Sequence, residues 1–142
     1  MSLSLWMLLG FAGWTLLTLI VGVGAPRWTL IVLGRGDLTS FPGDTPHGSA
    51  SYRRAVRAHA NCLETLPVFA TVVLTATVAH FVGRAMDVLA ATTMGARIVQ
   101  TSVHVLFRER TRTIAVRFSF FLVQVIAIIA MGLLVAIAAI GV

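Results

Sequence analysis

Four long apolar stretches, separated by short polar ones, make up nearly all of this chain of 142 residues. A helix that crosses the hydrocarbon core of a bilayer needs roughly 20 predominantly apolar residues. The stretches predict membrane-spanning helices over about residues 3–23, 52–82, 85–107 and 113–140. The pattern therefore indicates an all-α integral membrane protein, a four-transmembrane-helix bundle formed by a single domain over residues 1–142.

The connection between the first two predicted spans is the only extended polar one in the sequence. We expect the first span to end at Gly24-Ala25-Pro26, because a proline commonly stops a helix. The polar connection then runs from Arg27 to Ser51, with Pro42-Gly43-Asp44 as turn-forming residues. The other two connections are short: a tight turn at Gly83-Arg84 and a loop over Arg108-Glu109-Arg110-Thr111-Arg112.

Composition excludes a soluble domain: 58% of the residues are hydrophobic and 11% are charged, and the mean hydropathy is +0.93. All eleven cationic residues are arginines, against five acids, which gives a net charge of +6. Four spans leave no soluble basic face for nucleic acid, so we do not expect a nucleic-acid partner. The positive charge is better explained by membrane topology together with an anion site.

Most of the arginines fall in two of the three connections, at Arg27, Arg35, Arg53 and Arg54 and at Arg108, Arg110 and Arg112. The opposite side of the membrane carries Arg84 alone. Arginine-rich short loops stay in the cytoplasm. Both arginine-rich loops are therefore expected to face the cytoplasm, with both termini outside it.

A polar stripe enters the second span at Arg57, Asn61 and Glu64, whose offsets of four and three residues place them on one helix face. An ionisable group inside a membrane span costs about 2.5 kcal/mol or more, so it commonly marks a functional site or a buried pair. At 1.5 Å per residue, Glu64 and Arg97 of the third span lie at similar depths, roughly 13 and 15 Å from the cytoplasmic helix ends. We expect these two side chains to pair.

Three predicted spans carry polar faces in the cytoplasmic half of the bilayer. The fourth span contributes Arg117 and Gln124. The third has four polar residues on one face: Arg97, Gln100, Thr101 and His104. A cavity lined by arginines favours a carboxylate-bearing ligand, because the guanidinium group pairs with carboxylates through two hydrogen bonds. A structural network between helices, without a ligand, is the alternative. The four histidines are scattered and predict no metal site.

The run Arg57-Ala58-His59-Ala60-Asn61-Cys62-Leu63-Glu64-Thr65-Leu66-Pro67-Val68-Phe69 resembles the second-helix signature of the MAPEG family, the membrane-associated proteins in eicosanoid and glutathione metabolism. The family pattern there is of the type Arg-Ala-x-x-Asn-x-x-Glu-x-x-Pro-x-Phe. Four spans in about 140 residues, the long first loop and Gly95-Ala96-Arg97 in the third span also fit. The resemblance covers essentially the whole chain.

The resemblance implies a left-handed four-helix bundle, assembled as a homotrimer, that binds glutathione as a co-substrate between subunits near the cytoplasmic face. It implies that Arg57, Asn61 and Glu64 hold the tripeptide with help from Arg54, and that Arg97 braces Glu64. Gln100 and His104 complete the expected binding set. The thiol-activating arginine would be Arg112 or Arg117, of which Arg112, followed by Thr113, fits the family's Arg-Ser/Thr pair better. A cation beside the sulfur stabilises the thiolate, the nucleophilic form.

Two functions from different classes follow. The first is a membrane-embedded glutathione, or similar thiol, transferase or peroxidase that acts on lipophilic electrophiles arriving from the bilayer. The second is a non-catalytic structural or accessory subunit of a larger membrane complex. Family members often carry Tyr where this chain has Thr65, and His or Tyr where it has Gln100 and His104. The missing tyrosines favour the second function, whereas the arginines at one depth favour the first. A small transporter is disfavoured, because no polar stripe continues into the outer half.

Overall fold

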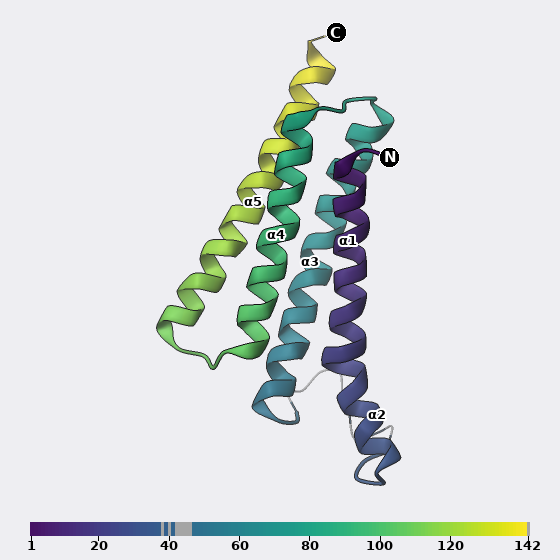
Figure 1. Cartoon of the computed structure of the whole chain (residues 1–142), viewed down its shortest axis with the longest axis vertical. Helices are drawn as coiled ribbons and strands as arrows, with labels where there is room; N and C mark the ends of the chain where they lie inside the picture. Colours follow the sequence, from purple (N-terminus) through teal and green to yellow (C-terminus); the bar gives the residue numbers. More distant parts are fainter. Residues whose placement is uncertain (38, 40, 42–46, 142) are drawn as a thin grey trace.

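The protein is an all-helical bundle of four long antiparallel rods (Figure 1), which confirms the fold class expected from the sequence. The structure is a computed structural model, and it describes residues 1–37, 39, 41 and 47–141. The expected turn residues Pro42-Gly43-Asp44 lie outside the described residues. The first rod is built of three consecutive helical segments, and each of the other three is a single helix.

The first rod consists of α1 (Leu3–Leu17), the π-helical segment η1 (Thr18–Gly24) and α2 (Ala25–Val32). The expectation that this helix ends at Pro26 is wrong. Proline lacks an N–H group and its ring collides with the carbonyl four residues earlier in a regular α-helix. The wider turns of η1, in which the N–H of Ala25 donates to the carbonyl of Ile20, accommodate the proline in the first turn of α2. The rod therefore continues to Val32.

The remaining rods are α3 (Ala50–Val78), α4 (Arg84–Leu106) and α5 (Thr111–Ile140). Helix α3 begins at Ser49, whose hydroxyl accepts a hydrogen bond from the N–H of Tyr52 at 3.1 Å, the usual way to satisfy a free N–H at a helix start. It runs through Pro67 and ends at Val78, before the expected limit at residue 82.

By length and composition, three helices in the described chain are able to cross a membrane: Leu3–Val32, Ala50–Val78 and Thr111–Ile140. Helix α4 is more polar, but it packs against α1, α3 and α5 and turns its polar residues towards them. Large apolar side chains cover the outside of the bundle instead. Leu9, Ile129 and Leu133, for example, are each more than half exposed. An apolar exterior around a polar helix face is what a lipid environment requires.

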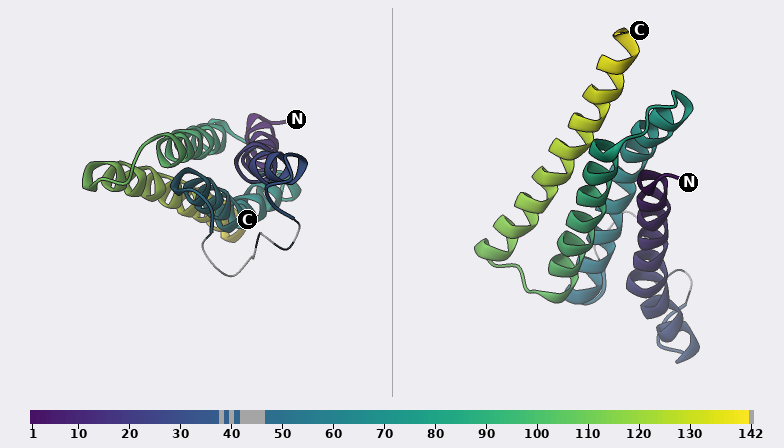
Figure 2. Two further views of the ribbon diagram at one scale, coloured as in Figure 1. Left: turned by 90° about the horizontal axis from the view of Figure 1, so that it is seen from below. Right: turned by 45° about the horizontal axis from the view of Figure 1, so that its top comes forward.

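The two ends of the bundle differ in what they carry. Both termini and the α3–α4 connection lie at one end, which we call the terminal end (Figure 1). Helix α2, the start of α3 and the α4–α5 loop lie at the other, which we call the arginine end; Figure 2 views the bundle from this end in its left panel. The arginine-rich segments that were expected on one side of the membrane are thus together at one end of the fold.

Candidate functional site

Helix α3 presents two parallel stripes at the arginine end, one inside the bundle and one on its surface. The buried stripe is Ala58, Cys62, Thr65 and Phe69. Arg57, Asn61 and Glu64 each precede a member of that stripe by one residue, so they are rotated by about 100° from it. Arg57 and Glu64 are accordingly exposed and Asn61 is half-buried. The stripe with the expected binding residues therefore faces outward from a single subunit.

The expected ion pair between Glu64 and Arg97 is absent from the described residues. Arg97 is 1% exposed, and its guanidinium group donates a hydrogen bond to the hydroxyl of Thr65. That hydroxyl in turn donates to the backbone carbonyl of Asn61 at 3.1 Å. The guanidinium carbon also lies 5.3 Å from the ring centroid of Phe11, a cation–π contact. The pairing expectation is wrong because α3 turns Thr65, not Glu64, towards α4 at this depth.

A second interior contact joins α4 to α5. The Nε2 group of Gln124 donates to Oε1 of Gln100 at 3.0 Å, and Nε2 of Gln100 donates to the carbonyl of Arg117 at 3.2 Å. One turn further along α4, His104 is 2% exposed, and its Nε2 atom has no hydrogen-bond partner in the described chain. The expected binding residues Arg97, Gln100 and His104 therefore lie between the helices and away from the bundle surface.

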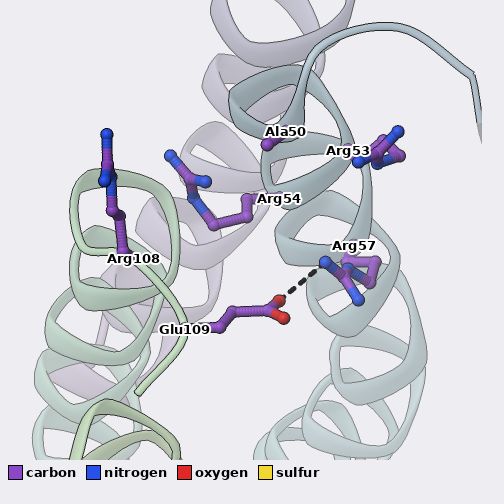
Figure 3. A pocket seen from close by; sticks show the side chains of 6 residues that line it. All are labelled: Ala50, Arg53, Arg54, Arg57, Arg108 and Glu109. Atoms are coloured by element: carbon purple, nitrogen blue, oxygen red, sulfur yellow. Dashed lines mark hydrogen bonds and ion pairs between the residues drawn. The ribbon is translucent and has the colours of Figure 1, made fainter.

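A pocket of about 350 Å³ opens at the arginine end between the first turns of α3 and the α4–α5 loop (Figure 3). It is lined by Ala50, Arg53, Arg54, Arg57, Arg108 and Glu109. Glu109 points towards Arg57 in Figure 3, and its Oε1 atom lies 2.6 Å from a terminal nitrogen of that guanidinium group. We call this the arginine pocket.

The sequence reasoning missed Glu109 as a site residue. It lies in the run Arg108-Glu109-Arg110, in which the arginines were explained by topology and the acid was ignored. The available signal was the acid itself, which stands between two arginines in a loop whose positive charge sets the membrane topology. The same reasoning did identify Arg54, whose Nε group reaches across to α4 and donates to the carbonyl of Val105 at 3.4 Å.

An apolar groove of about 210 Å³ lies between α1, η1, α3 and α4. Its walls include Leu17, Val21 and Leu106, which are themselves exposed at the bundle surface. Val105 lines this groove while its carbonyl holds Arg54, which lines the arginine pocket. A residue that lines the charged cavity is thus in contact with a residue that lines the apolar one.

The two candidate thiol-activating arginines occupy different positions on α5. Arg112 lies in the first turn, is exposed, and makes no hydrogen bond or ion pair within the described chain. Arg117 is half-buried, and its Nε atom is buried without a hydrogen-bond partner. Neither lines the arginine pocket of its own subunit.

The only tyrosine of the chain, Tyr52, has a partner outside the arginine pocket. Its hydroxyl accepts a hydrogen bond from Nε of Arg27 at 2.5 Å, and the Arg27 guanidinium lies 5.8 Å from the Tyr52 ring centroid. This contact ties α2 to the start of α3. It leaves the arginine pocket without an aromatic lining residue among those that the structure describes.

The fold and these cavities define a polytopic helical membrane protein with an arginine-lined pocket at one end of its bundle. The MAPEG family model matches residues 3–137, nearly the full length, so the chain belongs to the MAPEG family. The resemblance found in the second-helix motif is thereby confirmed. No curated protein sequence and no solved structure matches the chain significantly.

Proposed function

We propose that the protein is a membrane-embedded thiol transferase or peroxidase that joins glutathione, or a similar thiol, to lipophilic electrophiles from the bilayer. The observation that carries this proposal is the contact between the arginine pocket and the apolar groove, made by Arg54 with the Val105 carbonyl. A carboxylate-bearing thiol suits the first cavity, because guanidinium groups bind carboxylates strongly. An alkyl or aryl substrate suits the second, which opens among lipid-facing side chains. Membership of the MAPEG family agrees with a glutathione-related activity.

In this proposal the outward stripe of α3 binds the thiol. Arg57 and Arg54 hold its carboxylates, and Asn61 and Glu64 bind its peptide groups. Arg97, Gln100 and His104 act behind that surface, since they lie between the helices. Arg97 holds the Asn61 turn of α3 through the Thr65 hydroxyl, so it positions the binding stripe without touching the ligand.

The chemical step needs a thiolate near the apolar groove. A guanidinium group beside the sulfur stabilises the thiolate and so favours loss of the thiol proton to water. The thiolate then forms a carbon–sulfur bond to the electrophile, whose leaving group departs with the electron pair. We propose Arg112 for this role, with Arg117 as the other candidate.

The proposed assembly is a homotrimer with the thiol held between subunits. Two observations support it: the stripe of α3 that carries Arg57, Asn61 and Glu64 faces outward, and Arg112 has no partner among the described residues of its own chain. An exposed arginine at the start of α5 is available to a neighbouring copy's pocket. We further propose that the arginine end faces the cytoplasm and both termini face away from it, because arginine-rich loops are retained there.

Glutathione binding by the detergent-purified protein tests this function. Calorimetric titration of the wild type, Arg57→Ala and Asn61→Ala is expected to show binding that both substitutions weaken. Conjugation of a lipophilic electrophile, followed spectroscopically, then separates the two candidate activators: Arg112→Ala should reduce the turnover number with little change in thiol affinity, and Arg117→Ala should not. A wild-type protein that binds no thiol contradicts the proposal.

The second candidate function is an accessory subunit of a larger membrane complex. It is favoured by the apolar exposed face of the later turns of α5, with Ile126, Ile129 and Leu133 each more than half exposed. The lining of the arginine pocket, which has no aromatic residue among those that the structure describes, also favours it. Purification in a mild detergent distinguishes the two functions. Stoichiometric partner subunits together with no thiol binding support the accessory role.

A further inference from the structure

Among the residues that the structure describes, Glu109 is the single acid that lines the arginine pocket, beside four arginines: Arg53, Arg54, Arg57 and Arg108. Its side chain is 42% exposed and that of Arg57 is 56% exposed, so both are free to move in solvent. The excess of positive charge attracts anions into the pocket. Figure 3 shows the Glu109 carboxylate on the guanidinium group of Arg57, a position that a ligand carboxylate would also take.

An acid at this position works against a purely anionic ligand. It repels the incoming carboxylate and competes with it for Arg57. The arrangement favours a ligand only if that ligand also brings a positive group. In an α-amino acid the ammonium and carboxylate groups share one carbon atom, so they require an acid and a guanidinium group in immediate contact. Glu109 and Arg57, 2.6 Å apart, meet this requirement.

We propose that Glu109 is a specificity-determining residue that selects thiols with a free α-amino acid end, and that it disfavours thiols whose amine is acylated. This inference rests on the proposed function and extends it to the class of thiol. The ligand carboxylate takes the place of Glu109 on Arg57, and the released Glu109 carboxylate accepts hydrogen bonds from the neighbouring ammonium. Opening the original pair costs little, because exposed ion pairs contribute little to stability.

The test compares two ligands and three proteins. Glutathione has a free α-amino acid end at its γ-glutamyl residue, and N-acetylglutathione carries an acetyl group on that nitrogen, which removes the ammonium charge. Their dissociation constants are measured by titration calorimetry at low ionic strength with the wild type, Glu109→Gln and Glu109→Asp. The aspartate variant is the matched control, since it keeps the charge. Thermal denaturation in detergent checks that all three proteins are folded.

The wild type is expected to prefer glutathione over the acetylated ligand by about tenfold, because a hydrogen bond between charged groups is lost. Glu109→Gln should bind glutathione about fivefold more weakly and the acetylated ligand more tightly, since repulsion and competition are removed. Glu109→Asp should keep the wild-type preference. In Glu109→Gln the affinity for glutathione should fall while the affinity for the acetylated ligand rises. A merely structural role of Glu109 would instead lower the affinity for both ligands.

Three results overturn the inference. If Glu109→Gln keeps the wild-type preference, another group recognises the ammonium, and the proposed function still stands. If both ligands weaken equally, Glu109 supports the loop and selects nothing. If the wild type binds neither ligand, the proposed function fails and the selectivity with it. A second neutral variant, Glu109→Ala, repeats the comparison if the glutamine variant is unstable.

Discussion

The two halves of the bundle are built from the same four rods but have opposite interiors. Towards the terminal end, the buried cluster is apolar and includes Phe69, Val73, Met86 and Met131. Towards the arginine end, small apolar residues such as Ala58 and Cys62 share the interior with a group of buried polar side chains: Thr65, Arg97, Gln100, Thr101, His104 and Gln124. Phe11 lies at the junction: its ring centroid is 5.5 Å from that of Phe69 and 5.3 Å from the guanidinium carbon of Arg97.

This difference separates packing from function. Association of helices in lipid depends mainly on van der Waals packing, which close-fitting apolar side chains supply. Polar side chains at the same depth are expensive unless they are paired or serve a purpose. The apolar half should therefore carry most of the stability, and the polar half the ligand chemistry. Substitutions in the apolar half and in the polar half test whether stability and ligand binding are divided in this way.

The largest expected effect is on stability, from Phe69→Ala. The Phe69 side chain is 0% exposed, so its truncation leaves a cavity and should lower the free energy of unfolding by about 3 kcal/mol. Unfolding in mixed detergent is the measurement, with Phe118→Ala as the matched control because Phe118 is 62% exposed. The control should change stability by about 0.5 kcal/mol or less. Equal losses from both variants would contradict the packing role of the terminal half.

The next effect is on binding, from Arg57→Ala. Loss of a hydrogen bond between charged groups should weaken glutathione binding by roughly 10- to 100-fold. Stability should hardly change, because Arg57 is exposed. Arg84→Ala is the matched control, since Arg84 is exposed at the terminal end. A comparable loss of binding in the control would mean that overall charge, and not the arginine pocket, holds the ligand.

Much of the fold could be predicted from the sequence because lipid imposes long apolar helices. The polar stripe Arg57, Asn61 and Glu64 could also be recognised, since helical spacing alone places three residues on one face. The rotation of α3 could not. Depth along a helix follows from residue number, but the side that faces a neighbour depends on packing, which turns Thr65 and not Glu64 towards Arg97.

Two other features escaped prediction for local reasons. The first rod passes Pro26 because η1 widens just before it, and nothing in a run of small and aliphatic residues announces a π-helical turn. Glu109 lies in a loop whose conformation has no periodic signal, so its contact with Arg57, fifty-two positions earlier, depends on the tertiary fold. Site residues on helices were therefore easier to find than the one on a loop.

A smaller effect is expected from the polar interior itself. The hydrogen bond between Gln124 and Gln100 should contribute about 0.6 kcal/mol, the average for polar contacts between membrane helices. A double-mutant cycle with Gln100→Leu and Gln124→Leu, measured by unfolding in detergent, isolates this coupling. Coupling above about 2 kcal/mol would show that the polar half also carries a large part of the stability.

The smallest effect is expected from the ion pair between Arg57 and Glu109. Both side chains are well exposed, so the coupling measured in a cycle of Arg57→Ala and Glu109→Ala should lie below about 0.5 kcal/mol. It should decrease further at high salt, because exposed charges are screened. Unfolding of the four proteins at low and high ionic strength provides the measurement.

This weak coupling is what distinguishes the arginine pocket from the interior contacts beneath it. A pair that opens easily leaves Arg57 available to a ligand carboxylate, whereas a strong pair would keep the guanidinium group occupied. A salt-insensitive coupling of 2 kcal/mol or more would place the pair among the structural contacts, well above the range of exposed pairs. The outward stripe of α3 would then have to bind its ligand without its leading cation.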